Sequence, residues 1–95
     1  MPKFEEHCDE SERLFGKRYE EVHLWLDELF WKGLGARHRC KRHHEAGIRQ
    51  VVQLFGEEAG KAARKHVISD LKEWGWTEDD PFPEDEEHYL RMGLF

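Results

Sequence analysis

The segment KRYEEVHLWLDELFWK, residues 17–32, carries the clearest structural signal in the chain. Its apolar residues recur three or four positions apart, on one stripe of a helix: Val22, Trp25, Leu26 and Leu29. Gly33 and Gly35 follow, and glycine commonly ends a helix. The segment therefore predicts an amphipathic helix whose apolar stripe must be covered by partner helices.

Two further helices follow from the same periodicity. The second predicted helix spans residues 36–55 and ends at Gly56. The residues on its inner face are Cys40, His44, Ile48, Val51 and Phe55. The third predicted helix spans residues 57–74 and ends before Gly75. The residues on its inner face are Ala59, Ala63, His66, Val67, Asp70, Leu71 and Trp74. A short helix in residues 4–15 is also compatible with the pattern. Because the loops are short, neighbouring helices should be antiparallel.

We therefore expect an all-α fold, a small bundle of three main helices in a single domain of 95 residues. Residues 1–16 form an N-terminal segment, residues 17–75 the helical core and residues 76–95 a C-terminal arm. The arm should be extended, because the acidic run 78–87 contains Pro81 and Pro83.

Composition limits the class of protein. Hydrophobic and charged residues each make up 38% of the chain, and four Trp and six Phe argue against disorder. The net charge of -6 argues against general binding to nucleic acid or to anionic membranes. Residues 1–12 hold no apolar run, no membrane-length segment is present, and Cys8 and Cys40 form no CxxC motif. These features predict a cytoplasmic protein with reduced thiols and no membrane association.

The seven histidines are the unusual feature of the composition. His23-x-x-x-Asp27 lies in the first predicted helix and His66-x-x-x-Asp70 in the third, and residues four apart share one helix face. In an unbroken helix over residues 36–55, His44 points inward, whereas His38 and His43 point sideways. His7 and His88 are expected in surface arms.

These groups predict a metal site between the helices, with a divalent Zn, Fe, Mn or Ni ion as cofactor. The predicted ligands are His23, Asp27, His44, His66 and Asp70. The residues expected to orient them or to bind an anion are Arg37, His38, Arg42 and His43. A metal-dependent hydrolase is one activity that such a site supports. The alternative is a structural network, in which buried aspartates accept hydrogen bonds from buried histidines and no metal binds.

The pattern also resembles the domain-of-unknown-function family 6915 over roughly two thirds of the chain. The residues that carry the resemblance are Phe15-Gly16, Tyr19, His23 to Asp27, Arg37-His38-Arg39, Arg42-His43-His44, Gly47-Ile48, Leu54-Phe55-Gly56, His66-Val67 and Asp70-Leu71. The connection before His66 is shorter here than in the family, and residues 57–65 predict helix instead. The resemblance implies that these polar residues form one shared motif; it implies no activity.

Two other surfaces suggest partners. Residues 37–49 are basic and could follow a phosphate backbone, although a solvated face that pairs with the many acidic residues is the favoured interpretation. The tail ends in apolar residues: Tyr89, Leu90, Met92, Leu94 and Phe95. We expect them either to fold back onto the bundle or to bind a partner, most simply a second copy of the chain. The alternative function is accordingly a small acidic interaction protein, an adaptor or inhibitor without enzymatic activity.

Overall fold

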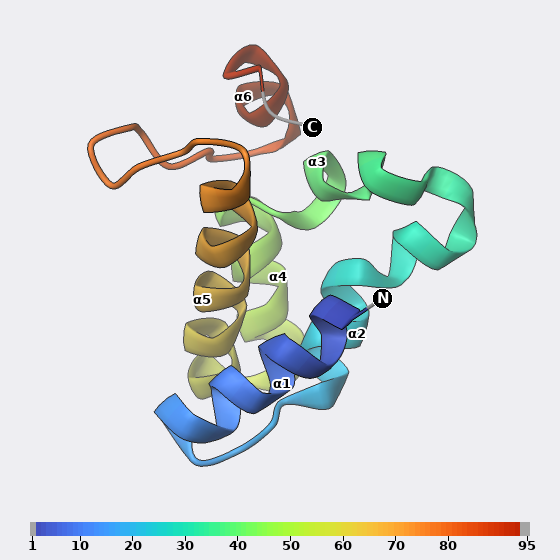
Figure 1. The fold of residues 1–95 in the computed structure, drawn as a ribbon, viewed down its shortest axis with the longest axis vertical. Helices are drawn as coiled ribbons and strands as arrows, with labels where there is room; N and C mark the ends of the chain where they lie inside the picture. The colour runs from blue at the N-terminus through green and yellow to red at the C-terminus, as the bar shows by residue number, and fades with distance from the viewer. Residues whose placement is uncertain (1, 94–95) are drawn as a thin grey trace.

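The computed structural model describes residues 2–93, apart from the side chains of residues 2, 3, 36 and 37. Within that range it is all-helical and has no strand, which confirms the predicted fold class (Figure 1). The α-helices are α1 (Pro2–Phe15), α2 (Glu20–Leu29), α3 (Arg39–Arg42), α4 (Glu45–Phe55), α5 (Glu57–Glu73) and α6 (Glu86–Arg91). None of these helices has both the length and the apolar character needed to span a membrane.

The helices α1, α2 and α5 lie where the sequence predicts them. α2 begins after Tyr19, which has a left-handed backbone (φ 52°), and ends at Leu29. It continues into a π-helical turn, Phe30–Leu34, and a 3₁₀ turn, Gly35–His38. Gly33 has φ 110°, which side chains other than hydrogen rarely permit, so a glycine is required there.

The predicted single helix over residues 36–55 is wrong, because the chain breaks between α3 and α4. His44 adopts an extended backbone (φ -158°), and its Nδ1 accepts a hydrogen bond from the Gly47 amide at 3.1 Å. His44 thus caps α4 in the way that Asn or Ser commonly caps a helix. The break rotates the two preceding turns relative to α4, so the inward positions counted from an unbroken helix do not apply.

The core lies where α2, α4 and α5 meet. α4 and α5 run side by side after a sharp turn at Gly56 (φ 99°), and α1 crosses both α2 and α5 (Figure 1). The buried apolar side chains form one cluster: Val22, Leu26, Ile48, Val51, Ala59, Ala63, Val67, Leu71, Trp76 and Tyr89. Because several are small, this core gives limited apolar burial, and polar side chains occupy much of the remaining interior.

The C-terminal segment folds back onto the bundle. Residues 76–85 are non-helical, as expected, and the carbonyls of Pro83 and Glu84 accept hydrogen bonds from the first amides of α4. The run was predicted to stay extended to residue 87, but Asp85 caps α6 and starts a helix at Glu86, because its carboxylate accepts the His88 amide at 2.9 Å.

The predicted partner-binding residues of the tail have different environments. Tyr89 is fully buried in the core and Met92 packs against it, so these two fold back, as one of the two expectations had it. Leu90 is half exposed. Leu94 and Phe95 lie outside the described residues.

We predict that Gly47→Ala destabilises the protein by about 2–4 kcal/mol, at the high end for one substitution. A methyl group at Gly47 would overlap the backbone carbonyl of Arg42, so the turn at residues 43–44 could not close. Gly60→Ala is the matched control, because its methyl would meet only a side-chain methyl of Val52. Urea denaturation measures both; equal losses for the two variants would contradict this account of the turn.

Candidate functional site

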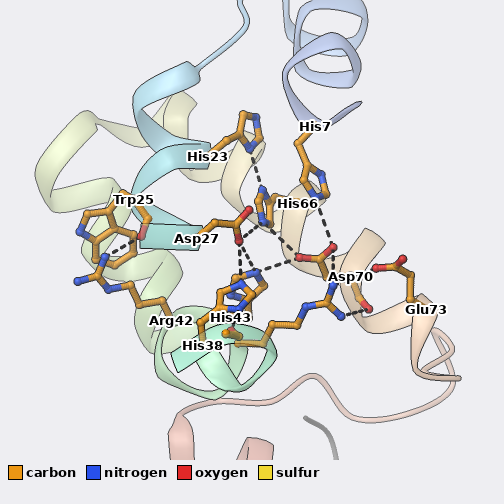
Figure 2. Close-up of polar contacts among 12 residues, drawn as sticks. His7, His23, Trp25, Asp27, His38, Arg42, His43, His66, Asp70 and Glu73 are labelled. Carbon is orange, nitrogen blue, oxygen red and sulfur yellow. Dashed lines mark hydrogen bonds and ion pairs between the residues drawn. The ribbon is translucent and has the colours of Figure 1, made fainter. Parts of the chain in front are cut away.

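Two aspartates meet in the interior among histidines from several helices (Figure 2). Asp27 comes from α2 and Asp70 from α5, while His43 lies at the break after α3 and His66 lies on α5. One nitrogen or oxygen atom from each of these four residues lies within 4.8 Å of those from the other three. The four residues, Asp27, His43, His66 and Asp70, are called the His/Asp cluster below.

The separations in the His/Asp cluster match those of atoms that surround one ion. Nε2 of His66 is 3.3 Å from Oδ1 of Asp27 and 3.3 Å from Oδ2 of Asp70. Nε2 of His43 is 3.5 Å and 3.0 Å from the same two oxygens. Ligands placed tetrahedrally at about 2.0–2.1 Å from a metal are about 3.3–3.4 Å from one another.

His66 shows that hydrogen bonds alone leave the cluster incomplete. Its side chain is fully buried, yet Nε2 makes no hydrogen bond to any described residue. The nitrogen faces the gap between the two carboxylates at 3.3 Å from each, rather than pointing along a bond to either. A buried imidazole nitrogen without a hydrogen bond is costly, and this position suits a ligand to a shared cation.

A chain of hydrogen bonds holds His66 from behind. Nδ1 of His66 and Nδ1 of His23 are 2.8 Å apart, and Nε2 of His23 is 2.7 Å from Oγ of Ser11 on α1. All three side chains are buried. His23 therefore fixes the ring of His66 instead of facing the carboxylates itself (Figure 2).

The far oxygen of Asp70 has its own neighbours. Nε2 of His7, on α1, lies 3.3 Å from Oδ1, and the His7 ring stacks on His66 with centroids 3.7 Å apart. The guanidinium of Arg39 lies 3.4 Å from the same oxygen and also contacts Glu73 at 3.1 Å. Asp70 thus presents Oδ2 to the cluster and Oδ1 to His7 and Arg39.

Asp27 is held by His38. Nε2 of His38 is 3.0 Å from Oδ1 of Asp27, and Nδ1 lies 2.8 Å from the carbonyl oxygen of Gly35. The 3₁₀ turn brings the ring to this position, since His38 and Gly35 are three residues apart in it. These two contacts fix the position of the Asp27 carboxylate relative to the 3₁₀ turn.

The electrostatics of the cluster follow from burial and charge. Burial alone would raise the pKa of the two aspartates, but hydrogen bonds from the surrounding imidazoles hold the pKa of both well below the usual range. Burial would lower the pKa of His66, but the carboxylates of Asp27 and Asp70 outweigh it and raise that pKa to about 9. Burial, with His66 and His7 nearby, lowers the pKa of His23 to about 3.

The structure brings Asp27, His66 and Asp70 together from the predicted ligands, with His23 one contact away. It places His44 elsewhere, because that ring caps α4, and the neighbouring His43 reaches the carboxylates instead. Arg42 points away: it contacts the carbonyl of Trp25 at 2.6 Å and Glu28 at 3.0 Å, and lies over the Trp25 ring. The side chain of Arg37 is outside the described part.

Three residues around the cluster were not predicted from the sequence: His7, Ser11 and Arg39. The assignment of His7 to a surface arm is wrong, since its side chain is 4% exposed. His7 and Ser11 are four residues apart on α1, the same spacing as the two His-x-x-x-Asp pairs. That spacing could have indicated that His7 and Ser11 belong to the site. No feature of the sequence distinguishes Arg39 from the neighbouring arginines.

A cavity of about 270 Å³ reaches the cluster from one side. Its polar lining is Asp27, His38, Arg39 and Asp70, and its apolar lining is Phe4, Leu24, Phe30 and Trp31. Leu24 and Trp31 are 53% and 64% exposed, so the cavity meets the surface beside them. Both aspartates thus contribute to the lining of this cavity.

Comparison with known proteins supports a shared family and little more. A family model described as "Domain of unknown function (DUF6915)" matches residues 2–82. The match covers α1 to α5, and so it includes every residue of the His/Asp cluster. No curated protein and no solved structure was found to match the chain.

We predict that the metal-free protein is most stable near pH 6–7. His23 is neutral when folded (pKa about 3) but gains a proton below pH 6.5 when unfolded, so stability falls as the pH drops. His66 keeps its proton when folded up to about pH 9, so its contribution is lost as the pH rises from 6.5 through 9, by about 3 kcal/mol at most. Urea denaturation with a chelator at pH 5, 6.5 and 9.5 measures this; constant stability from pH 6.5 to 9.5 would contradict it.

Proposed function

Because this chain belongs to the domain-of-unknown-function family DUF6915, we propose its function from the site itself: it binds one divalent transition metal ion through Asp27, His43, His66 and Asp70. One observation carries the proposal. The nitrogen and oxygen atoms of these residues are 3.0–3.5 Å apart in four cross pairs, and the buried Nε2 of His66 lies between both carboxylates without a hydrogen bond.

The chemistry of the donors fits such an ion. Two imidazoles and two carboxylates are a mixed nitrogen and oxygen set, which suits Zn²⁺, Fe²⁺, Mn²⁺ or Ni²⁺. The two negative charges of the aspartates match the charge of the ion. The surrounding residues hold the donors in place, with His38 on Asp27, His23 on His66 and Arg39 on Asp70.

Hydrolysis is the activity we propose for the metal-loaded protein. Because Asp27, His43, His66 and Asp70 would supply four ligands, this activity requires a fifth coordination position on the ion. An ion with such a position open to solvent would lower the pKa of bound water and polarise a carbonyl or phosphoryl oxygen. Asp27 and Asp70 line the cavity, so that a substrate can approach the same side of the cluster. The second function, an acidic interaction protein, draws less support from the tail, because Tyr89 is in the core and Glu86 pairs with Lys41 at 2.8 Å.

The competing interpretation is a structural network without metal. In that case His66 carries a proton, and the charges of His66 and Arg39 balance those of Asp27 and Asp70. The network accounts for the burial of the charges but leaves Nε2 of His66 without a directed hydrogen bond. Metal analysis separates the two interpretations.

We predict that the purified, untagged protein holds close to one metal ion per chain, measured by mass spectrometry. His43→Asn should lose it, whereas the matched His44→Asn should keep it, since His43 contacts both carboxylates and Asn at position 44 can still cap α4. No stoichiometric metal in the wild-type protein, after growth and reconstitution with each of the four metals, would contradict the proposal. Loss in both variants with normal folding would contradict the choice of His43.

We also predict slow, metal-dependent hydrolysis of a simple activated ester, with 4-nitrophenyl acetate and 4-nitrophenyl phosphate as the probes. The rate should fall to the background rate in His43→Asn and after chelation, and should persist in His44→Asn. Release of 4-nitrophenol is followed by absorbance. If the metal-loaded protein hydrolyses neither probe faster than the free ion does, the proposed hydrolytic activity is wrong, although the proposed metal site stands.

A further inference from the structure

The cavity beside the His/Asp cluster is divided into a polar floor and an apolar wall. Asp27, His38, Arg39 and Asp70 lie together at the cluster, and Phe4, Leu24, Phe30 and Trp31 make up the rest of the lining. Phe30 and Trp31 come from the π-helical turn after α2, a kind of turn that often occurs at functional sites. Their rings meet edge to face with centroids 5.0 Å apart, and Phe30 also meets the His38 ring at 5.5 Å.

The polar floor offers few free hydrogen bonds to a ligand. His38 already contacts Asp27 and the carbonyl of Gly35 through its two nitrogens. Arg39 contacts the carbonyl oxygen of Asp70, its carboxylate and Glu73. A ligand in this cavity would therefore be recognised by charge at the floor, by an ion in the cluster and by apolar contact at the wall.

The charges around the cavity determine which charge a ligand should carry. A divalent ion neutralises Asp27 and Asp70, and His66 as a ligand to that ion is neutral. Of the two partners of Arg39, Asp70 lines the cavity at 3.4 Å, whereas Glu73, at 3.1 Å, lies outside the lining and is 39% exposed, so that solvent screens its charge. The guanidinium of Arg39, 12% exposed, then leaves one positive charge among the residues that line the cavity. A partly buried site with one excess positive charge favours one negative charge on what it binds.

The volume and the apolar lining of the cavity indicate the size and the uncharged part of the ligand. A dry cavity of about 150 Å³ in another protein holds benzene, so about 270 Å³ is enough for one ring and a carboxylate. Aromatic side chains favour a planar ring through stacking or edge contacts.

We propose that this cavity binds a small monoanion with one aromatic group, an aryl carboxylate in chemical class, with the carboxylate at the floor and the ring against Phe30 and Trp31. This inference rests on the proposed metal site, because the charge of the ion is needed, together with that of Arg39, to exceed the two negative charges of the aspartates.

The test uses the zinc-loaded full chain, with zinc content measured first, and titration calorimetry with benzoate, acetate and benzylamine. We expect benzoate to bind at least tenfold more tightly than acetate, and benzylamine not to bind. Trp31→Ala should keep the zinc and acetate binding but lose most of the preference for benzoate. Leu54→Ala is the control, because Leu54 is an exposed apolar residue (60%) outside this cavity.

Each result bears on one of the two proposals. If zinc is bound but benzoate binds no better than acetate, or benzylamine binds as well as benzoate, the inference is overturned and the metal site stands. An unchanged benzoate preference in Trp31→Ala overturns the placement of the ring. If zinc does not bind, the proposed function fails and the inference fails with it. Removal of zinc by a chelator should abolish benzoate binding; full binding after chelation would contradict the role of the ion.

Discussion

The structure depends on keeping two negative charges, those of Asp70 (4% exposed) and Asp27 (18% exposed), mostly out of water in a protein of 95 residues. An ion that leaves water for the interior costs several kcal/mol unless opposite charge and hydrogen bonds compensate it. The compensation here comes from α1, from the segment between α2 and α4, and from α5 itself. His7 is supplied by α1, His38 by the 3₁₀ turn after α2, Arg39 by α3, His43 by the break before α4, and His66 by α5. The interior is therefore organised around the carboxylates as much as around the apolar cluster.

The break at His43 and His44 is the local event that makes this arrangement possible. One of two adjacent histidines uses its ring to start α4, and the other is released to reach both carboxylates. Gly47 permits the break, because no side chain fits beside the Arg42 carbonyl. The C-terminal segment then fills the open start of α4 with the carbonyls of Pro83 and Glu84. The tail thus supports the position of His43.

The sequence predicted the helices that rest on apolar periodicity, since that pattern reflects packing directly. It identified Asp27, His66 and Asp70 because they lie four residues from another polar group on a strongly periodic helix. The prediction failed at residues 36–55, where His44 caps α4 and the helix is broken. Histidine is not among the residues that commonly cap helices, so nothing in the sequence indicated the break. With an unbroken helix assumed, His44 was predicted to point inward in place of His43. His7 was missed for another reason: α1 contains few apolar residues, and the burial of His7 depends on the polar cluster that it helps to complete.

The central claim is that the ion lies between the carboxylates and is held by His43, not by His44. Anomalous X-ray diffraction at the zinc absorption edge, from crystals of the zinc-loaded protein, tests it most directly. The account predicts one strong peak about 2.0–2.2 Å from the side-chain atoms of Asp27, His43, His66 and Asp70. A peak at His44 or His88 alone, or no peak at the cluster in crystals that contain zinc, would contradict it.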